Sequence, residues 1–184
     1  MGIKINYFGK LNEPGLACNI IRELEDISNE MDWKYTVINE ESSIIGGIAI
    51  TPHPKSEPFS FIFDLNGYTL RIMDISTGET DVNTEQKNYV SVKTQYAPVE
   101  IHIAMIKLLK YLKKKYINDL EVMDEGCYWE TENKEILIQK ISFLNEMMDK
   151  VAEVLDNIKI DKNEPKESII LKIENALRER FGNN

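Results

Sequence analysis

The sequence predicts an α+β protein with a mostly antiparallel sheet of five to seven strands, covered by helices on one face and followed by a C-terminal αα-hairpin. Two observations lead to this prediction. A run of strand-like segments lies between helical ones, and Asn66-Gly67 joins two segments of alternating polarity. Asn-Gly in that position is the strongest short-range signal of a β-hairpin, and hairpins pair their strands antiparallel.

The N-terminal part of the chain alternates between strand and helix patterns. Residues 3–8 alternate as a strand, and a helix is predicted to start near Asn12, before Pro14. One face of this helix carries Leu16, Ile20, Leu24, Ile27 and Met31. The strands expected next are 33–40, 44–51, 59–64, 68–74 and 89–96, with a polar loop at 76–88. Alternation places Phe59, Phe61 and Phe63 on one face of the sheet.

The C-terminal part is mainly helical. A helix is predicted at 98–116, a short strand at 119–124, and two helices at 133–160 and 166–181. Apolar residues recur along the first of these two helices in alternating steps of four and three: Leu137, Ile141, Leu144, Met148, Val151, Leu155 and Ile158. Further apolar residues beside this seam indicate that the helix has more than one neighbour.

Two domains follow from this pattern. Residues 1–132 form an α+β domain, and residues 133–184 form the helical hairpin. The hairpin either packs on its own sheet or pairs with the hairpin of a second subunit. The width of its apolar face favours the second arrangement, a homodimer.

The formal net charge of −9 excludes a nucleic-acid binder that acts through overall electrostatics. One helix carries an unusual number of lysines: Lys107, Lys110, Lys113, Lys114 and Lys115. No aromatic residues interleave with them to stack bases, and the opposite face of the helix is apolar. We interpret them as the solvated face of a helix that covers the sheet. We expect neither a nucleic acid nor a membrane as a partner.

Compartment and cofactor are predicted from what the sequence lacks. Two cysteines are too few for a disulfide scaffold, and the first ten residues lack the apolar core of a secretory signal. We expect a soluble, cytoplasmic protein. No phosphate-binding glycine motif occurs, and Cys18, Cys127, His53 and His102 lack metal-ligand spacing. The sequence therefore predicts no cofactor and no metal.

The stretch DEGCYWETENKE, residues 124–135, contains two aromatic residues among acids. As a docking surface, Tyr128 and Trp129 would be the anchors, with Glu125 and Glu130 in an acidic rim that attracts a basic partner. As a wall of the core, Trp129 would cover apolar residues while the acids flank the next helix. Either role leaves Cys127 unreactive, because neighbouring carboxylates disfavour its thiolate.

Two classes of function remain open. The favoured one is a non-enzymatic binding or regulatory protein, such as an acidic inhibitor or immunity-type partner of a basic protein. The alternative is a small hydrolase or transferase that uses Glu125, Glu130 and His102 in a cleft between sheet and helix. His102 lies at the margin of an apolar stripe, where a buried, hydrogen-bonded histidine is commoner than a catalytic base.

Overall fold

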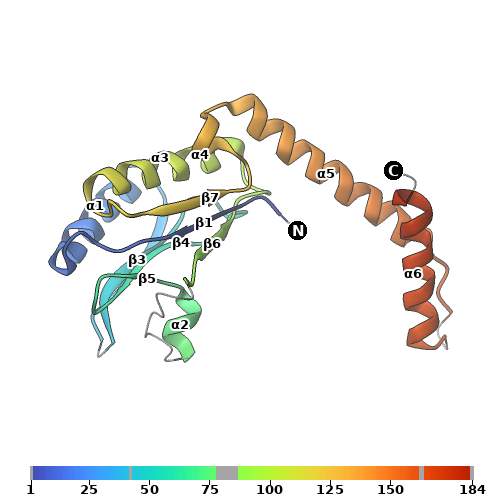
Figure 1. Cartoon of the computed structure of the whole chain (residues 1–184), viewed down its shortest axis with the longest axis horizontal. Coiled ribbons are helices and arrows are strands. Elements are labelled where there is room, and N and C mark those ends of the chain that lie inside the picture. The colour runs from blue at the N-terminus through green and yellow to red at the C-terminus, as the bar shows by residue number, and fades with distance from the viewer. Residues whose placement is uncertain (1, 42, 78–86, 162–163, 183–184) are drawn as a thin grey trace. The chain divides into compact units, whose positions relative to one another are not determined.

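The structure is a computed structural model that describes residues 2–41, 43–77, 87–161 and 164–182 (Figure 1). It divides into two compact units, Met1–Ile138 and Gln139–Asn184. The predicted α+β class is confirmed, because the first unit combines helices with antiparallel strands.

The seven strands of the described residues form two antiparallel sheets, where the sequence predicted one. In the smaller sheet β1 is the central strand and pairs with β6 on one side and β7 on the other. In the larger sheet the order is β2-β3-β4-β5, so β2 lies at an edge. The strands are β1 (Lys4–Phe8), β2 (Lys34–Ile38), β3 (Ile44–Thr51), β4 (Phe59–Asp64), β5 (Thr69–Leu70), β6 (Val90–Lys93) and β7 (Glu121–Asp124).

An aromatic core joins the two sheets. Phe59, Phe61 and Phe63 of β4 are fully buried, and the other residues of β4 are buried as well. The ring centroid of Tyr7, from β1, lies 5.3 Å from that of Phe59 and 5.4 Å from that of Phe61. The Tyr7 hydroxyl donates a hydrogen bond of 2.5 Å to the backbone carbonyl of Ser60. Burial raises the pKa of this hydroxyl, so it stays protonated and keeps its role as donor.

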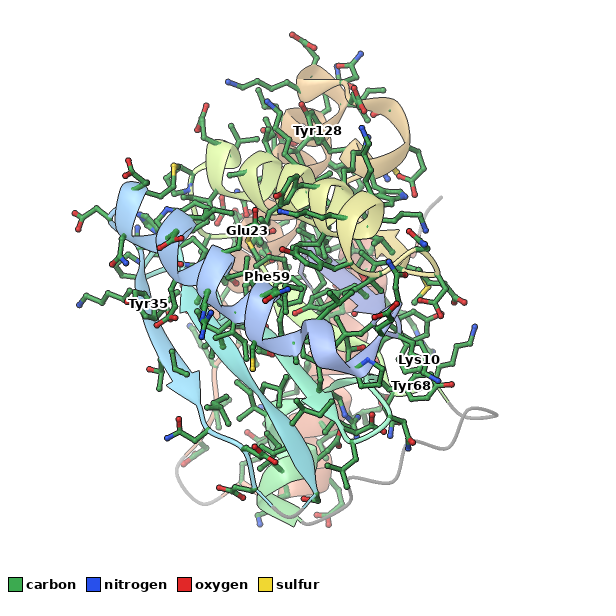
Figure 2. The ribbon with its side chains drawn as sticks, turned by 90° about the vertical axis from the view of Figure 1, so that its left-hand side faces the viewer. Lys10, Glu23, Tyr35, Phe59, Tyr68 and Tyr128 are labelled. Atoms are coloured by element: carbon green, nitrogen blue, oxygen red, sulfur yellow. The ribbon has the colours of Figure 1, made fainter. Side chains whose placement is uncertain are left out.

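Two helices cover the sheets. Helix α1 (Ala17–Glu30) follows a 3₁₀ turn (Pro14–Leu16) and packs on β3. Of the apolar face that the sequence predicted, Ile20 and Leu24 are buried, whereas Met31 is 52% exposed. Helix α3 (Val99–Lys115) buries Met105, Leu109 and Leu112. Figure 2 shows α1 in front of the larger sheet, with β2 at its outer edge.

Helices α1 and α3 are joined through one carboxylate. Glu23 of α1 accepts hydrogen bonds from the Lys115 ammonium at 2.7 and 2.8 Å and from the Tyr116 hydroxyl at 2.5 Å. The Tyr111 hydroxyl is a third donor. Partial burial acts to raise the Glu23 pKa, but these donors outweigh it and hold that pKa below its ordinary value.

The strand predicted at 68–74 is correct only in part. The Asn66-Gly67 turn joins β4 to β5, with Gly67 in the left-handed region at a φ of 87°. After β5 the chain forms a short helix, α2 (Ile72–Thr77). The Asp74 carboxylate accepts a hydrogen bond of 3.1 Å from the Arg71 backbone N–H and pairs with the Arg71 guanidinium. This local contact closes a helical turn in place of strand pairing. Of the loop predicted at 76–88, residues 78–86 lie outside the described residues.

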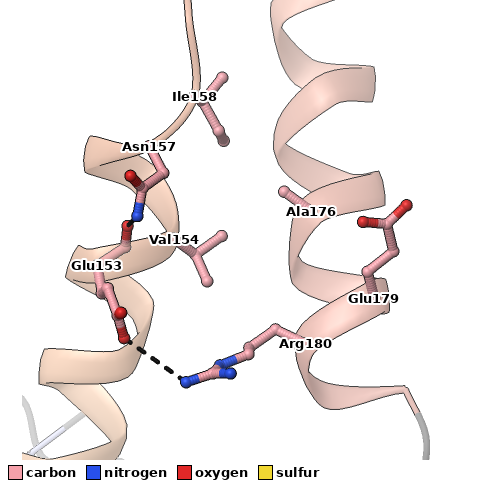
Figure 3. A pocket seen from close by; sticks show the side chains of 7 residues that line it. All are labelled: Glu153, Val154, Asn157, Ile158, Ala176, Glu179 and Arg180. Atoms are coloured by element: carbon pink, nitrogen blue, oxygen red, sulfur yellow. Dashed lines mark hydrogen bonds and ion pairs between the residues drawn. The ribbon is translucent and has the colours of Figure 1, made fainter.

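The second unit contains the αα-hairpin that the sequence predicted. Helix α5 (Lys134–Asp156) begins within the first unit and continues into the second, where α6 (Lys166–Phe181) pairs with it. An ion pair of 3.6 Å between Arg180 and Glu153 links the two helices (Figure 3).

We expect Phe61→Ala to lower the free energy of unfolding by about 3–5 kcal/mol, because it leaves a cavity between the sheets. Leu65→Ala, at a side chain that is 56% exposed, is the control and should change stability by less than about 0.5 kcal/mol. Urea unfolding followed by fluorescence measures both. Equal losses in the two variants would show that the aromatic core does not hold the unit together.

Candidate functional site

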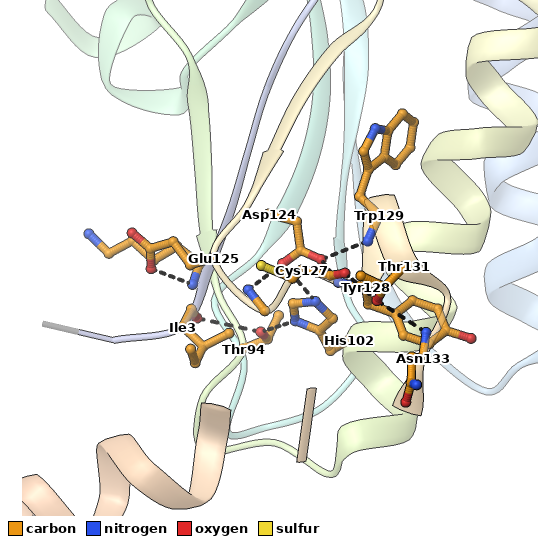
Figure 4. A network of polar contacts seen from close by, with 12 residues as sticks. Ile3, Thr94, His102, Asp124, Glu125, Cys127, Tyr128, Trp129, Thr131 and Asn133 are labelled. Carbon is orange, nitrogen blue, oxygen red and sulfur yellow. Dashed lines mark hydrogen bonds and ion pairs between the residues drawn. The ribbon is translucent and has the colours of Figure 1, made fainter. Parts of the chain in front are cut away.

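The turn after β7 is organised by the carboxylate of Asp124, whose residue is only 7% exposed. Its Oδ1 accepts a hydrogen bond of 2.7 Å from the backbone N–H of Gly126. Its Oδ2 accepts bonds of 2.6 Å from Tyr128 and 2.9 Å from Trp129, also from backbone N–H groups (Figure 4). One side chain thus satisfies three backbone donors at the start of the short helix α4 (Tyr128–Thr131).

His102 of α3 lies beneath this turn and is fully buried. Its Nε2 is 3.0 Å from Asp124 Oδ1, although the oxygen lies off the N–H direction of a good hydrogen bond, so the contact is mainly electrostatic. Its Nδ1 is 2.7 Å from the hydroxyl oxygen of Thr94. The Thr94 hydroxyl also donates to the backbone carbonyl of Ile3 at 3.5 Å, so it links His102 to the residue that precedes β1.

The electrostatics of Asp124 follow from these partners. Burial, the largest influence, acts to raise the Asp124 pKa, whereas His102 and the backbone N–H groups of Trp129 and Gly126 act to lower it. The lowering contacts prevail, so the pKa lies below its ordinary value of 3.8. The carboxylate is therefore charged at neutral pH and holds the turn in place.

The Thr94 side chain contacts His102, which in turn contacts Asp124. This is the spatial arrangement of a catalytic triad, in which a nucleophile contacts a base and an acid orients that base. A catalytic triad must present its nucleophile to a substrate. Thr94 is 1% exposed and His102 is 0% exposed, so no substrate reaches either group. The arrangement joins β7 to α3 and serves the fold.

Gly126 shows how closely the turn packs on this network. A Cβ atom added there would lie 2.5 Å from Leu137 Cδ1 and 3.0 Å from His102 Nε2. A side chain at this position would therefore have to displace Leu137.

The side chains predicted to form a docking surface at 124–135 differ in how far they are buried. Tyr128 is buried and Trp129 is half-buried, while Glu125 and Glu130 are exposed. Glu125 accepts a hydrogen bond of 3.0 Å from the Lys4 backbone N–H. Figure 4 shows the Glu125 and Trp129 side chains leaving the turn in opposite directions. They do not form one patch, and buried His102 does not converge with the two glutamates.

Several other charged side chains in this region form ion pairs. Lys110 pairs with Glu132 and lies 5.5 Å from the centroid of the Trp129 ring, within the range of a cation–π contact. Glu121 pairs with Lys87 at 2.5 Å. Of the other lysines on the lysine-rich helix, Lys115 pairs with Glu23.

A larger acidic surplus lies in residues 22–41, which the sequence analysis did not select. This segment carries seven Asp and Glu against Arg22 and Lys34. Only Glu23 among these acids forms an ion pair with a described residue. We call the five exposed acids of the segment the acidic surface: Asp26, Glu30, Asp32, Glu40 and Glu41. Counting charges in a window along the chain would have found it.

Two searches bear on ligands and membranes. The described residues contain no group of three His, Cys, Asp or Glu side chains that could hold a metal ion. None of the helices in the same residues is both long and apolar enough to cross a membrane.

Comparisons with protein-family models, with curated proteins and with solved structures found no match for this chain.

We expect Asp124→Asn to lower the free energy of unfolding by about 1.5–3 kcal/mol at neutral pH, because hydrogen bonds to a charged acceptor are lost. Glu125→Gln, with one exposed backbone contact, is the matched control and should change stability far less. Urea unfolding measures both. Equal losses of stability in the two variants would show that the charge of Asp124 has no special stabilising role.

The pH dependence gives a separate test of Asp124. Because its folded-state pKa is lowered, its stabilising contribution is complete above the ordinary pKa of 3.8 and is lost as the pH falls through the lower folded-state value. The stability difference between wild type and Asp124→Asn should therefore shrink as the pH falls below 3.8. A difference that stays constant through this range would contradict the assignment.

Proposed function

We propose that this chain is a non-enzymatic binding protein that holds a basic protein partner on the acidic surface of α1 and β2. The observation that carries the proposal is the position of the acids on α1. The last turn of this helix contains Glu30 and no basic residue, and Asp32 lies two residues after Glu30. A helix C-terminus carries partial negative charge, so acids there oppose stability. Residues that oppose stability are characteristic of a surface kept for binding.

The backbone at the end of α1 positions Asp32. With a φ of 54°, Asp32 lies in the left-handed region that ends many helices, and the Trp33 backbone N–H donates a hydrogen bond of 2.8 Å to the Ser28 carbonyl. The chain turns there from α1 into β2, which presents Asp32 near the start of the strand. Glu40 and Glu41 follow the end of the same strand. Acids therefore flank β2 at both of its ends.

The exposed edge of β2 suggests how a partner could bind. The order of the larger sheet leaves one edge of β2 without a strand partner among the described residues. Thr36 and Val37 are exposed, and the strand contains no proline or bulge that would block pairing. An extended basic segment could add to this edge through backbone hydrogen bonds, with its cations beside the flanking acids.

The enzymatic alternative has no comparable support. It requires Glu125, Glu130 and His102 to converge in a cleft, but His102 is sealed and the two glutamates are exposed. A cavity of about 430 Å³ near α2 is lined by apolar and polar residues such as Ile72, Glu57 and Tyr89, and none of the three candidates is among them. An inhibitor or immunity-type role requires only surface complementarity, so it remains our specific form of the proposal.

We expect Glu30→Lys to affect stability and binding in opposite directions. It places a cation at the C-terminus of α1 and should raise the free energy of unfolding by about 0.3–1 kcal/mol. Binding to lysine-rich peptides selected from a displayed library against the wild-type chain should weaken, and more so at low salt. Urea unfolding and calorimetric titration measure the two effects.

Glu130→Lys is the matched control, because it makes the same charge change on an exposed residue outside the acidic surface. It should reduce peptide binding much less than Glu30→Lys. A selected peptide that binds both variants equally, or a library that yields no basic peptide, would contradict the proposed function.

A further inference from the structure

The second unit lacks a core. None of its described residues is buried, although both helices carry apolar side chains along their length. The half-buried ones are Ile141, Leu144, Met147, Met148, Val151, Val154, Ile158, Ile169, Ile173, Leu177 and Phe181. The largely exposed ones are Phe143 (66%), Leu155 (42%), Ile160 (53%), Ile170 (56%) and Leu171 (56%). Two helices alone bury too little apolar surface to be stable, so this unit needs another surface against it.

The contact between α5 and α6 is itself incomplete. A groove of about 360 Å³ lies between them, with Val154 and Ile158 on one side and Ala176 on the other (Figure 3). Its polar lining consists of Asn157, Glu179 and the ion-paired Glu153 and Arg180. The groove therefore offers both apolar and polar side chains to another chain.

Charge distinguishes the possible occupants. Residues 139–184 carry eight Lys and Arg against nine Asp and Glu, a formal charge of −1. The remaining −8 of the net −9 belongs to residues 1–138. A nearly neutral hairpin does not select a strongly charged partner, and it does not repel a copy of itself.

The periodicity of α5 points to the same occupant. Its seam within this unit, from Ile141 to Leu155, keeps the steps of four and three that characterise helices in bundles. Met147 and Val154 widen this seam, so α5 can contact α6 and a further helix at once. Homodimer interfaces are more apolar than the rest of a protein surface, and the exposed side chains of this hairpin include many apolar ones.

We propose that the α5–α6 hairpin binds the hairpin of a second copy of this chain and forms an apolar four-helix interface. The two copies bury in each other the apolar side chains that the single hairpin leaves exposed. The consequence for binding, unlike the dimer itself, rests on the proposed function. A dimer carries two acidic surfaces and can bind a partner with two basic sites more tightly than one surface does.

Sedimentation equilibrium of the full chain at micromolar concentration tests the dimer. We expect twice the chain mass of 21.3 kDa. The variant Leu155→Glu with Ile170→Glu should sediment as a monomer. Both side chains are already largely exposed in the single hairpin, so these changes disturb little packing within one chain.

The control is Gln139→Glu with Ser142→Glu, which adds the same charge at exposed polar positions of α5. It should keep the dimer mass. Near-ultraviolet circular dichroism confirms that the first unit is folded in each variant. A wild-type chain of monomer mass would overturn the proposal, and so would a Leu155→Glu, Ile170→Glu chain that retains the dimer mass. This test needs no basic ligand, so its failure leaves the proposed function standing.

Discussion

The contact of the Tyr7 ring with Phe59 and Phe61 is the interaction on which the first unit depends. The two sheets are small, with three and four strands, and the apolar faces that they carry must be covered. The Tyr7 ring of the smaller sheet packs on a face of the larger sheet, and its hydroxyl donates a hydrogen bond to the backbone carbonyl of Ser60. Once the sheets are joined, α1 and α3 cover them and turn their charged faces outward. The acidic surface is a product of this packing.

The buried polar network has a related origin. A chain that turns sharply after β7 leaves backbone N–H groups with no partner in a sheet or helix, and buried donors of this kind must be satisfied. The Asp124 carboxylate supplies the acceptors, and His102 offsets the cost of burying its charge. Residue types that suggest catalysis in the sequence are thus used to hold a turn. The charges that remain available for a partner are the ones that the fold does not use.

Local patterns predicted most of the fold. Alternation and helical spacing located the strands and the main helices, because these periodicities reflect which side of each element is buried. The division into two sheets depends on Tyr7 meeting β4 across a long stretch of chain, which no local pattern contains. Helix α2 was missed because the contact between Arg71 and Asp74 outweighs a short alternating segment. His102 and Asp124 meet only after α3 has packed on β7. The acidic surface, in contrast, was visible in the charge count of residues 22–41.

The two units differ in what they offer to other molecules. The first has a formed core and nearly all of the net charge, whereas the second is nearly neutral and has no buried side chain among its described residues. Binding of a basic partner by the first unit is the central claim. Titrating the isotope-labelled full chain with a short lysine-rich peptide, followed by amide chemical shifts, tests it most directly. We expect the shifts to concentrate in residues 22–41 and to fade with added salt. Shifts concentrated in residues 121–135, with none in α1 or β2, would contradict the claim.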